Sequence, residues 1–126
     1  MLAQISYGEA ADKITILTIK SERINDPAKL VNIRRELELL SGAFFAEIAR
    51  TPAFDTLFAK LKAINETLWE IEDEIRELEA KQDFGARFIA LARSVYHTND
   101  KRAAVKNRIN QAFGSAIVEE KSYKGG

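Results

Sequence analysis

Apolar side chains recur every three or four residues over most of this chain, which is the spacing of one helix face. One series continues without a break through Leu57, Leu61, Ile64, Leu68, Ile71, Ile75 and Leu78. An earlier series follows the same spacing at Leu30, Ile33, Leu37, Leu40, Phe44 and Ile48. Seams of this period favour near-antiparallel packing between neighbouring helices. The pattern therefore predicts an all-α fold.

Polar residues and prolines mark the expected helix starts. Ser6 and Glu9 have the spacing of a capping box, in which a hydroxyl and a carboxylate bind amides at a helix start. Asp26-Pro27 and Thr51-Pro52 each place a capping side chain before a proline, and proline suits the first helical position. The last signal predicts a helix from Ala53 to Lys81, roughly 43 Å long at about 1.5 Å per residue.

Three segments leave alternatives open. The β-branched run 13–19 is compatible with a strand, but its alternation fails at Ile16-Leu17, which favours a helix. Asp83 can cap a further helix, and residues 84–113 form either one helix or two, depending on whether Thr98-Asn99-Asp100 starts a new one. The pair Ile117-Val118 forms a brief strand or docks on the bundle. We expect a four- to five-helix, near-antiparallel bundle in a single domain, residues 1–126.

Composition narrows the class of protein. The chain has 126 residues, of which 46% are hydrophobic and 30% charged, as in an ordinary globular domain. The absence of cysteine excludes disulfides, thiolate nucleophiles and Cys-based metal sites. No apolar run is long enough to span a membrane, and the start of the chain lacks the basic and apolar regions of a signal peptide. A cytoplasmic location is the expectation.

Charge is balanced overall but not along the chain. A net charge of zero argues against nucleic acid or an anionic membrane as partner. Residues 65–83 carry eight acids and two bases, whereas residues 84–113 carry six bases and one acid. Consecutive segments of opposite sign are expected to pack against each other.

Two stripes of polar side chains lie beside the apolar seams. The first consists of Asn65, Trp69, Glu72 and Arg76 at steps of four, three and four, bordered by Asp73. The second consists of Asn99, Arg102, Lys106 and Asn110 at steps of three, four and four, with Asp100 beside it and Arg93 and Tyr96 one to two turns earlier. If the two helices are neighbours, these stripes converge on a candidate site for a phosphate- or sugar-bearing ligand.

The same residues also have a structural interpretation. Glu72 and Arg76 have the spacing of an ordinary ion pair on a helix surface. Trp69 is compatible with a core position, and Asn65 and Asn110 are compatible with buried amides that fix the register between helices. A magnesium site formed by Glu9 and Asp12 with Glu72 and Asp73 is a weaker alternative, because the paired acidic motifs of such sites are not both present. His97 is the only histidine, and without a second histidine or a cysteine it is a poor candidate for a metal site. We therefore expect no metal and no cofactor.

Several of these strings resemble one family. They are Asn65-x-x-Leu68-Trp69-x-x-Glu72-Asp73-x-x-Arg76, then Arg93-x-Val95-Tyr96-x-x-Asn99-Asp100-x-Arg102-x-x-x-Lys106-x-x-Ile109-Asn110, and the opening Gly8-Glu9-x-x-Asp12-Lys13. The chain is similar over nearly its whole length to a family of small all-helical bacterial and phage proteins known only as a domain of unknown function. The resemblance implies that both polar stripes belong to one unit, and it implies no activity.

The sequence favours a non-enzymatic helical-bundle protein that binds a partner or ligand and associates with itself, as a homo-oligomer such as a dimer. The long seam from Leu57 to Leu78 and the paired phenylalanines, Phe44-Phe45 and Phe54 with Phe58, suggest more apolar surface than one small bundle covers. The alternative is an enzyme or binding protein for a phosphate- or sugar-bearing metabolite, that is, for a small anionic ligand. Neither nucleic acid nor a membrane is an expected partner.

Overall fold

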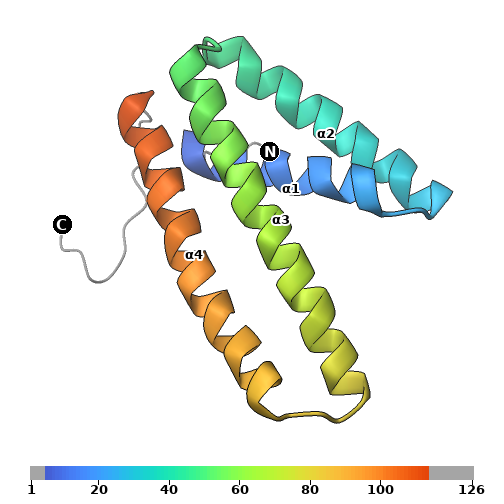
Figure 1. Ribbon diagram of the computed structural model, residues 1–126. Coiled ribbons are helices and arrows are strands. Elements are labelled where there is room, and N and C mark those ends of the chain that lie inside the picture. The colour runs from blue at the N-terminus through green and yellow to red at the C-terminus, as the bar shows by residue number, and fades with distance from the viewer. Residues whose placement is uncertain (1–4, 114–126) are drawn as a thin grey trace.

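The computed structural model describes residues 5–113, which form four helices (Figure 1). They are α1 (Tyr7–Arg23), α2 (Pro27–Glu47), α3 (Pro52–Ala80) and α4 (Ala86–Ala112). The all-α prediction is confirmed, and residues 86–112 form one continuous helix rather than two. The pair Ile117-Val118 lies outside the described residues.

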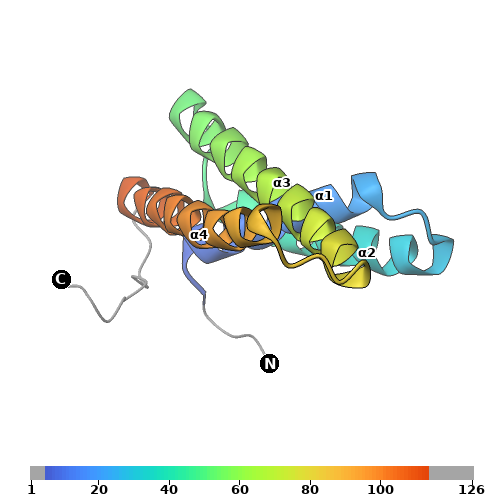
Figure 2. The same cartoon turned by 60° about the horizontal axis from the view of Figure 1, so that its bottom comes forward.

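The helices form two hairpins that cross. α3 and α4 run antiparallel as one long hairpin, and α1 lies across one of its faces, as Figures 1 and 2 show. α2 then returns over α1 towards the start of α3 (Figure 1). α1 packs against all three other helices, while α2 packs mainly on α1. The acidic and basic segments are therefore neighbours, since they lie on α3 and α4.

The helix starts follow the expected capping chemistry. The hydroxyl of Ser6 accepts a hydrogen bond from the Glu9 amide at 3.1 Å, and Asp26 and Thr51 cap α2 and α3 in the same way. The Glu9 carboxylate, however, binds Lys106 on α4. Residues 13–19 are helical because both Ile14 and Leu17 face the core at a helical spacing, and a strand would place them on opposite faces.

The main core lies where α1 meets the upper part of the α3–α4 hairpin and the end of α2. Its centre is the aromatic pair Phe44 and Phe54, whose ring centroids lie 5.7 Å apart. Further rings pack around it at 5.0 to 6.3 Å: Tyr7, Phe45, Phe58 and Phe113. The phenylalanines that suggested self-association are thus packed within the chain, and they give no support to an interface.

The turn between α3 and α4 differs from the expected one. Asp83 does not cap α4, whose N-cap is Gly85 with no side-chain hydrogen bond. Instead, Asp83 completes the end of α3: its amide donates to the Leu78 carbonyl while Gln82 donates to Glu79. This pair of bonds is a Schellman motif, which requires a left-handed residue, and Gln82 occupies that position with φ of 55°. The Asp83 carboxylate accepts from the Gly85 amide at 3.2 Å.

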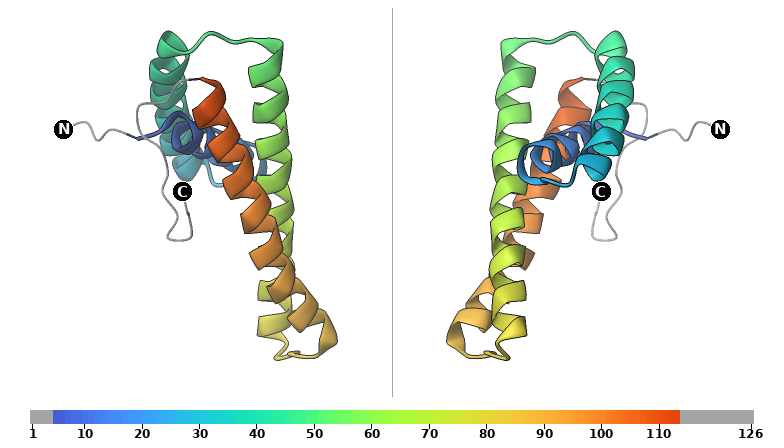
Figure 3. Two further views of the ribbon diagram at one scale, coloured as in Figure 1. Left: turned by 90° about the vertical axis from the view of Figure 1, so that its left-hand side faces the viewer. Right: turned by 90° about the vertical axis from the view of Figure 1, so that its right-hand side faces the viewer.

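The lower end of the hairpin extends beyond α1 and α2, as Figure 3 shows from both sides. We call residues 71–97 the free end, where α3 and α4 lie against each other beyond the contacts that Asn65 and Glu70 make with α1. Arg87 ties the two helices together through both oxygens of Glu74, at 2.6 and 2.8 Å. Within residues 5–113 no helix is long and apolar enough to cross a membrane.

Candidate functional site

A buried carboxylate joins α1 to both helices of the hairpin. Asp12 is only 2% exposed, and its two oxygens accept hydrogen bonds from Arg102 on α4 at 2.9 and 2.5 Å. One of these oxygens also accepts from the Asn65 amide on α3 at 2.9 Å. Asn65 donates to the Thr15 hydroxyl at 2.8 Å, and that hydroxyl donates to the Asp12 carbonyl. We call these four residues the Asp12 network.

This arrangement satisfies its own polar atoms. A carboxylate taken out of water needs a partner charge and further hydrogen bonds, and Asp12 has both. In residues 5–113 no buried side-chain nitrogen or oxygen lacks a hydrogen-bond partner. The network therefore explains why the helices cross at this point, since each of them supplies one part of it.

A glycine allows α1 to approach α4 closely. A Cβ at Gly8 would collide with the backbone carbonyl of Lys106, so only glycine fits. The Gly8 amide, one of the unpaired donors at the start of a helix, binds the Asn110 side chain at 2.7 Å. One turn away, the Lys106 ammonium binds the Glu9 carboxylate at 2.9 Å. Two members of the second predicted stripe thus hold α1 in place.

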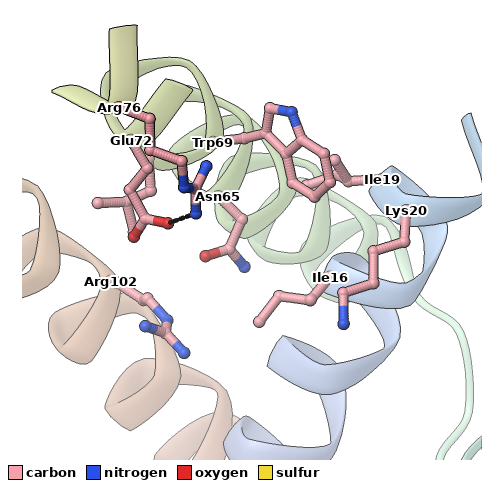
Figure 4. Close-up of a pocket in the computed structure, with 9 residues that line it drawn as sticks. Ile16, Ile19, Lys20, Asn65, Trp69, Glu72, Arg76 and Arg102 are labelled. Atoms are coloured by element: carbon pink, nitrogen blue, oxygen red, sulfur yellow. Dashed lines mark ion pairs between the residues drawn. The ribbon is translucent and has the colours of Figure 1, made fainter. Parts of the chain in front are cut away.

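Beside the Asp12 network lies a pocket of about 380 Å³, a size typical of small-molecule sites. It opens between α1, α3 and α4, as Figure 4 shows. Its apolar wall is formed by Ile16, Ile19, Leu68 and Trp69, and its polar lining by Lys20, Asn65, Glu72, Arg76 and Arg102.

The cations of the pocket differ in how they are neutralised. The guanidinium of Arg76 lies 3.5 Å from the carboxylate of Glu72 and 3.2 Å from that of Asp73, and both are exposed ion pairs within α3. Arg102 is held by Asp12. Lys20 has no hydrogen-bond or ion-pair partner among the described residues, and Figure 4 shows it extending beside Ile16 towards the space between the helices. The pocket therefore retains a positive charge for an anionic group.

A cation of α1 also lies against the Trp69 side chain, which lines the pocket. The Arg23 guanidinium lies over the Trp69 ring at 6.0 Å and binds Glu70 at 3.3 Å. Nearby, Lys62 lies between Glu22 and Glu66, at 3.2 and 3.3 Å. Burial acts to lower the Lys62 pKa, but its hydrogen bonds to the two carboxylates outweigh this and raise the pKa above its ordinary value. These pairs fasten the end of α1 to α3.

The predicted site residues divide into three groups. Five of them line the pocket: Asn65, Trp69, Glu72, Arg76 and Arg102. Four others make hydrogen bonds at the border of the pocket or further along the same stripes. They are Asp73 with Arg76, Asn99 with Arg102, Lys106 with Glu9 and Asn110 with Gly8. The remaining three, Arg93, Tyr96 and Asp100, are exposed and do not line the pocket.

Sequence reasoning missed the contribution of α1. From the sequence, Asp12 is expected only as a metal ligand or as part of the family string, and Ile16, Ile19 and Lys20 are not expected to line a site. One signal was available: Asp12 shares a helix face with Ile16 and Ile19, at steps of four and three, and an acid on an apolar face needs a cation from another helix.

The four carboxylates of the magnesium hypothesis do not come together. Asp12 binds Arg102 and Glu9 binds Lys106, whereas Glu72 and Asp73 lie beside Arg76 on α3. In the described part of the chain, no three His, Asp or Glu side chains gather as a group able to hold a metal ion.

Comparison with known proteins places the chain in a family. A family model described as a family of unknown function, DUF6165, matches residues 1–126. No curated protein and no solved structure matches the chain. The resemblance inferred from the polar strings agrees with the family match, which covers the whole sequence. The chain therefore belongs to this family of unknown function.

Proposed function

We propose that this chain is a non-enzymatic binding protein whose pocket between α1, α3 and α4 holds a small ligand. The ligand would combine an anionic group with a flat ring, as a nucleotide or a nucleotide-sugar does. The cytoplasmic location expected from the sequence is part of this proposal, and the cysteine-free composition agrees with it.

The observation that carries the proposal is the position of Lys20. Its ammonium group lines a pocket whose wall is largely apolar, and no carboxylate of the described residues neutralises it. An ammonium in such a place gains most from an anion that enters the pocket, because the apolar wall excludes competing water. Trp69 in the same wall offers an aromatic ring on which a flat group can stack.

The pocket is also held in shape before any ligand arrives. Arg102 and Asn65 are fixed by the buried Asp12 carboxylate, so two of its polar walls cannot rearrange without breaking the network. Preorganised groups lose little conformational entropy on binding, which favours affinity for a small molecule. Lys20 and Arg76 are the adjustable members.

The test is thermal unfolding of the purified protein with nucleoside mono- and diphosphates, nucleotide-sugars and inorganic phosphate. A ligand at about 100 times its Kd stabilises the folded state by about 2.7 kcal/mol, which is readily measured as a higher Tm. A nucleotide or nucleotide-sugar should raise the Tm more than inorganic phosphate does, because only the larger ligands reach both Lys20 and Trp69.

Two variants locate the site. Lys20→Ala and Trp69→Ala should each remove most of the response to the best ligand, whereas Lys60→Ala, an exposed cation outside this pocket, should leave the response unchanged. If no member of the panel raises the Tm, or if Lys60→Ala reduces the response as much as Lys20→Ala does, the proposed function is wrong.

A further inference from the structure

Apolar side chains are concentrated on the exposed part of the free end. Three of the six exposed large hydrophobic residues in the described range lie there: Phe84 at 50%, Ile89 at 56% and Tyr96 at 67%. Phe88 and Val95 between them are only partly covered. A surface of this kind on a two-helix end is typical of an interaction site.

These residues continue the stripes by which the hairpin binds α1. On α4, Phe88, Ala92, Val95 and Asn99 lead at steps of four, three, four and three to Arg102, the partner of Asp12. On α3, Asn65 and Trp69 are followed by Glu72 and Arg76 at steps of three and four. The face that α1 covers higher up is therefore left uncovered at the free end, as Figure 3 also shows.

The uncovered face is nearly symmetric about one level of the hairpin. α3 ends at Ala80 and α4 begins at Ala86, so residues 74 and 92, each six residues away from the turn, lie at the same height. On α3, Glu72 and Arg76 lie two residues on either side of this level. On α4, Ala92 marks the level itself.

The residues around Ala92 are paired by kind. Phe88 and Tyr96, both aromatic, lie four residues on either side of it. Ile89 and Val95, both aliphatic, lie three residues on either side. A two-fold axis perpendicular to the helices at this level would place each residue opposite its counterpart, aromatic on aromatic and aliphatic on aliphatic, with the small Ala92 side chains at the axis.

We propose that the free end is the interface of a symmetric dimer, in which a second copy of this chain packs its own free end antiparallel against the first. The interface of a two-fold dimer must be complementary to itself. The pairing by kind around Ala92 meets this condition. Besides forming the apolar pairs on α4, the axis would bring Glu72 of each copy opposite Arg76 of the other, which gives two charged pairs. The charge match identifies a second copy as the occupant.

The dimer and the proposed ligand would share Glu72 and Arg76, which line the pocket, whereas the apolar pairs on α4 lie outside it. Two short two-helix ends form an interface of the smaller, transient class, so half-dissociation is expected at about 10 to 100 µM. Sedimentation equilibrium from about 5 to 500 µM should therefore show a monomer that becomes a dimer as concentration rises. A monomer over the whole range would overturn the proposal and leave this face to a partner of another kind.

Two exposed alanines on α4 provide a matched pair of variants. Ala92→Glu places two carboxylates against each other at the axis and should weaken the dimer at least about tenfold. Ala104→Glu adds the same charge on a different face of α4, where it should leave dimerisation unchanged. Equal effects of the two variants, or an unchanged dimer in Ala92→Glu, would show that the axis is elsewhere.

A charge swap tests the ionic part of the interface. Glu72→Arg or Arg76→Glu alone places like charges opposite each other and should weaken the dimer. The double variant Glu72→Arg/Arg76→Glu should restore it, because each copy then presents the reversed but still complementary pair. The Tm at about 1 µM monitors the monomer fold of every variant. A double variant as weak as the single ones would contradict the predicted pairing.

Discussion

The two ends of the α3–α4 hairpin are built on different principles. At the upper end α1 lies across both helices, the aromatic cluster fills the core, and the charged Asp12 is satisfied inside the protein. At the free end no third helix covers the hairpin, and its main polar link is the Arg87–Glu74 pair, which is accessible to water. The same pair of helices is thus a core element at one end and a surface at the other.

The difference shows what a polar contact contributes in each setting. An ion pair exposed to water contributes little to the free energy of unfolding, because water already solvates both charges. A buried charge that loses its partner, in contrast, keeps the full cost of desolvation. Substitutions at the upper end should therefore have large effects on folding, whereas those at the free end should act on local opening and on association.

The largest effect is expected from Arg102→Ala. This change leaves the Asp12 carboxylate buried with only the Asn65 amide on its side-chain oxygens, so it should lower the free energy of unfolding by about 3 kcal/mol. Chemical denaturation measures the loss. Arg108→Ala, an exposed arginine on the same helix, is the control and should change stability by less than about 0.5 kcal/mol. Similar losses in both variants would contradict the structural role of the Asp12 network.

A smaller but more specific effect is expected from glycine replacements. Gly8→Ala forces α1 away from the Lys106 carbonyl and should cost about 1 to 3 kcal/mol, although alanine is the better helix former. Gly42→Ala adds a methyl group to an exposed position of α2 with open space around it, and it should stabilise the protein by about 0.5 to 1 kcal/mol. Chemical denaturation should therefore show that the free energy of unfolding falls in Gly8→Ala and rises in Gly42→Ala.

Sequence patterns predicted the helices well because each helix is determined locally. The seam from Leu57 to Leu78 and the caps at Asp26 and Thr51 depend only on spacing and on nearby amides. The turn after α3 was misread, since an aspartate that follows a helix suits either the end of one helix or the start of the next. The left-handed φ of Gln82 and the hydrogen bond from the Asp83 amide to the Leu78 carbonyl distinguish the two.

The sequence predicted the part of the pocket lining that lies on α3 and α4. The stripes on α3 and α4 follow from helical spacing, and opposite charge correctly made these helices neighbours. The crossing of α1 depends on tertiary contacts of Gly8 with Asn110 and of Asp12 with Asn65 and Arg102, which join residues 53 to 102 positions apart in the chain. Periodicity within one helix carries no information about which other helix crosses it, so Lys20 was not recognised as a pocket residue.

At the free end, the turn itself offers a test. Gln82 has a left-handed backbone, which costs a side-chain-bearing residue about 1 to 2 kcal/mol relative to the right-handed form. Gln82→Gly should therefore raise the free energy of unfolding by up to about 1 kcal/mol, the remainder being lost to the greater freedom of glycine in the unfolded chain. Gln111→Gly in the last turn of α4 should lower it. A loss of stability in Gln82→Gly would show that this side chain does more than occupy the turn.

The smallest effect concerns the pH dependence of the free end. The hydrogen bond from Arg87 lowers the pKa of Glu74 below its ordinary value of 4.5, and the arginine charge acts in the same direction against slight desolvation. A carboxyl whose pKa is lower in the folded state stabilises that state above its unfolded pKa, and this contribution is lost as pH falls through the folded pKa. Arg87 keeps its charge throughout this range.

Hydrogen exchange of the amides around residues 81–90 resolves this local effect better than global unfolding does, because the free end can open while the upper end stays folded. At neutral pH these amides should be better protected in the native chain than in Glu74→Gln, and the difference should shrink as pH falls below about 4.5. Glu77→Gln removes an exposed acid that has no ion-pair partner among the described residues, so it should leave the protection unchanged at every pH. If Glu74→Gln instead destabilised the amides of α1 equally, the two ends of the hairpin would open together, and the distinction between a buried and a surface-held end would not describe this protein.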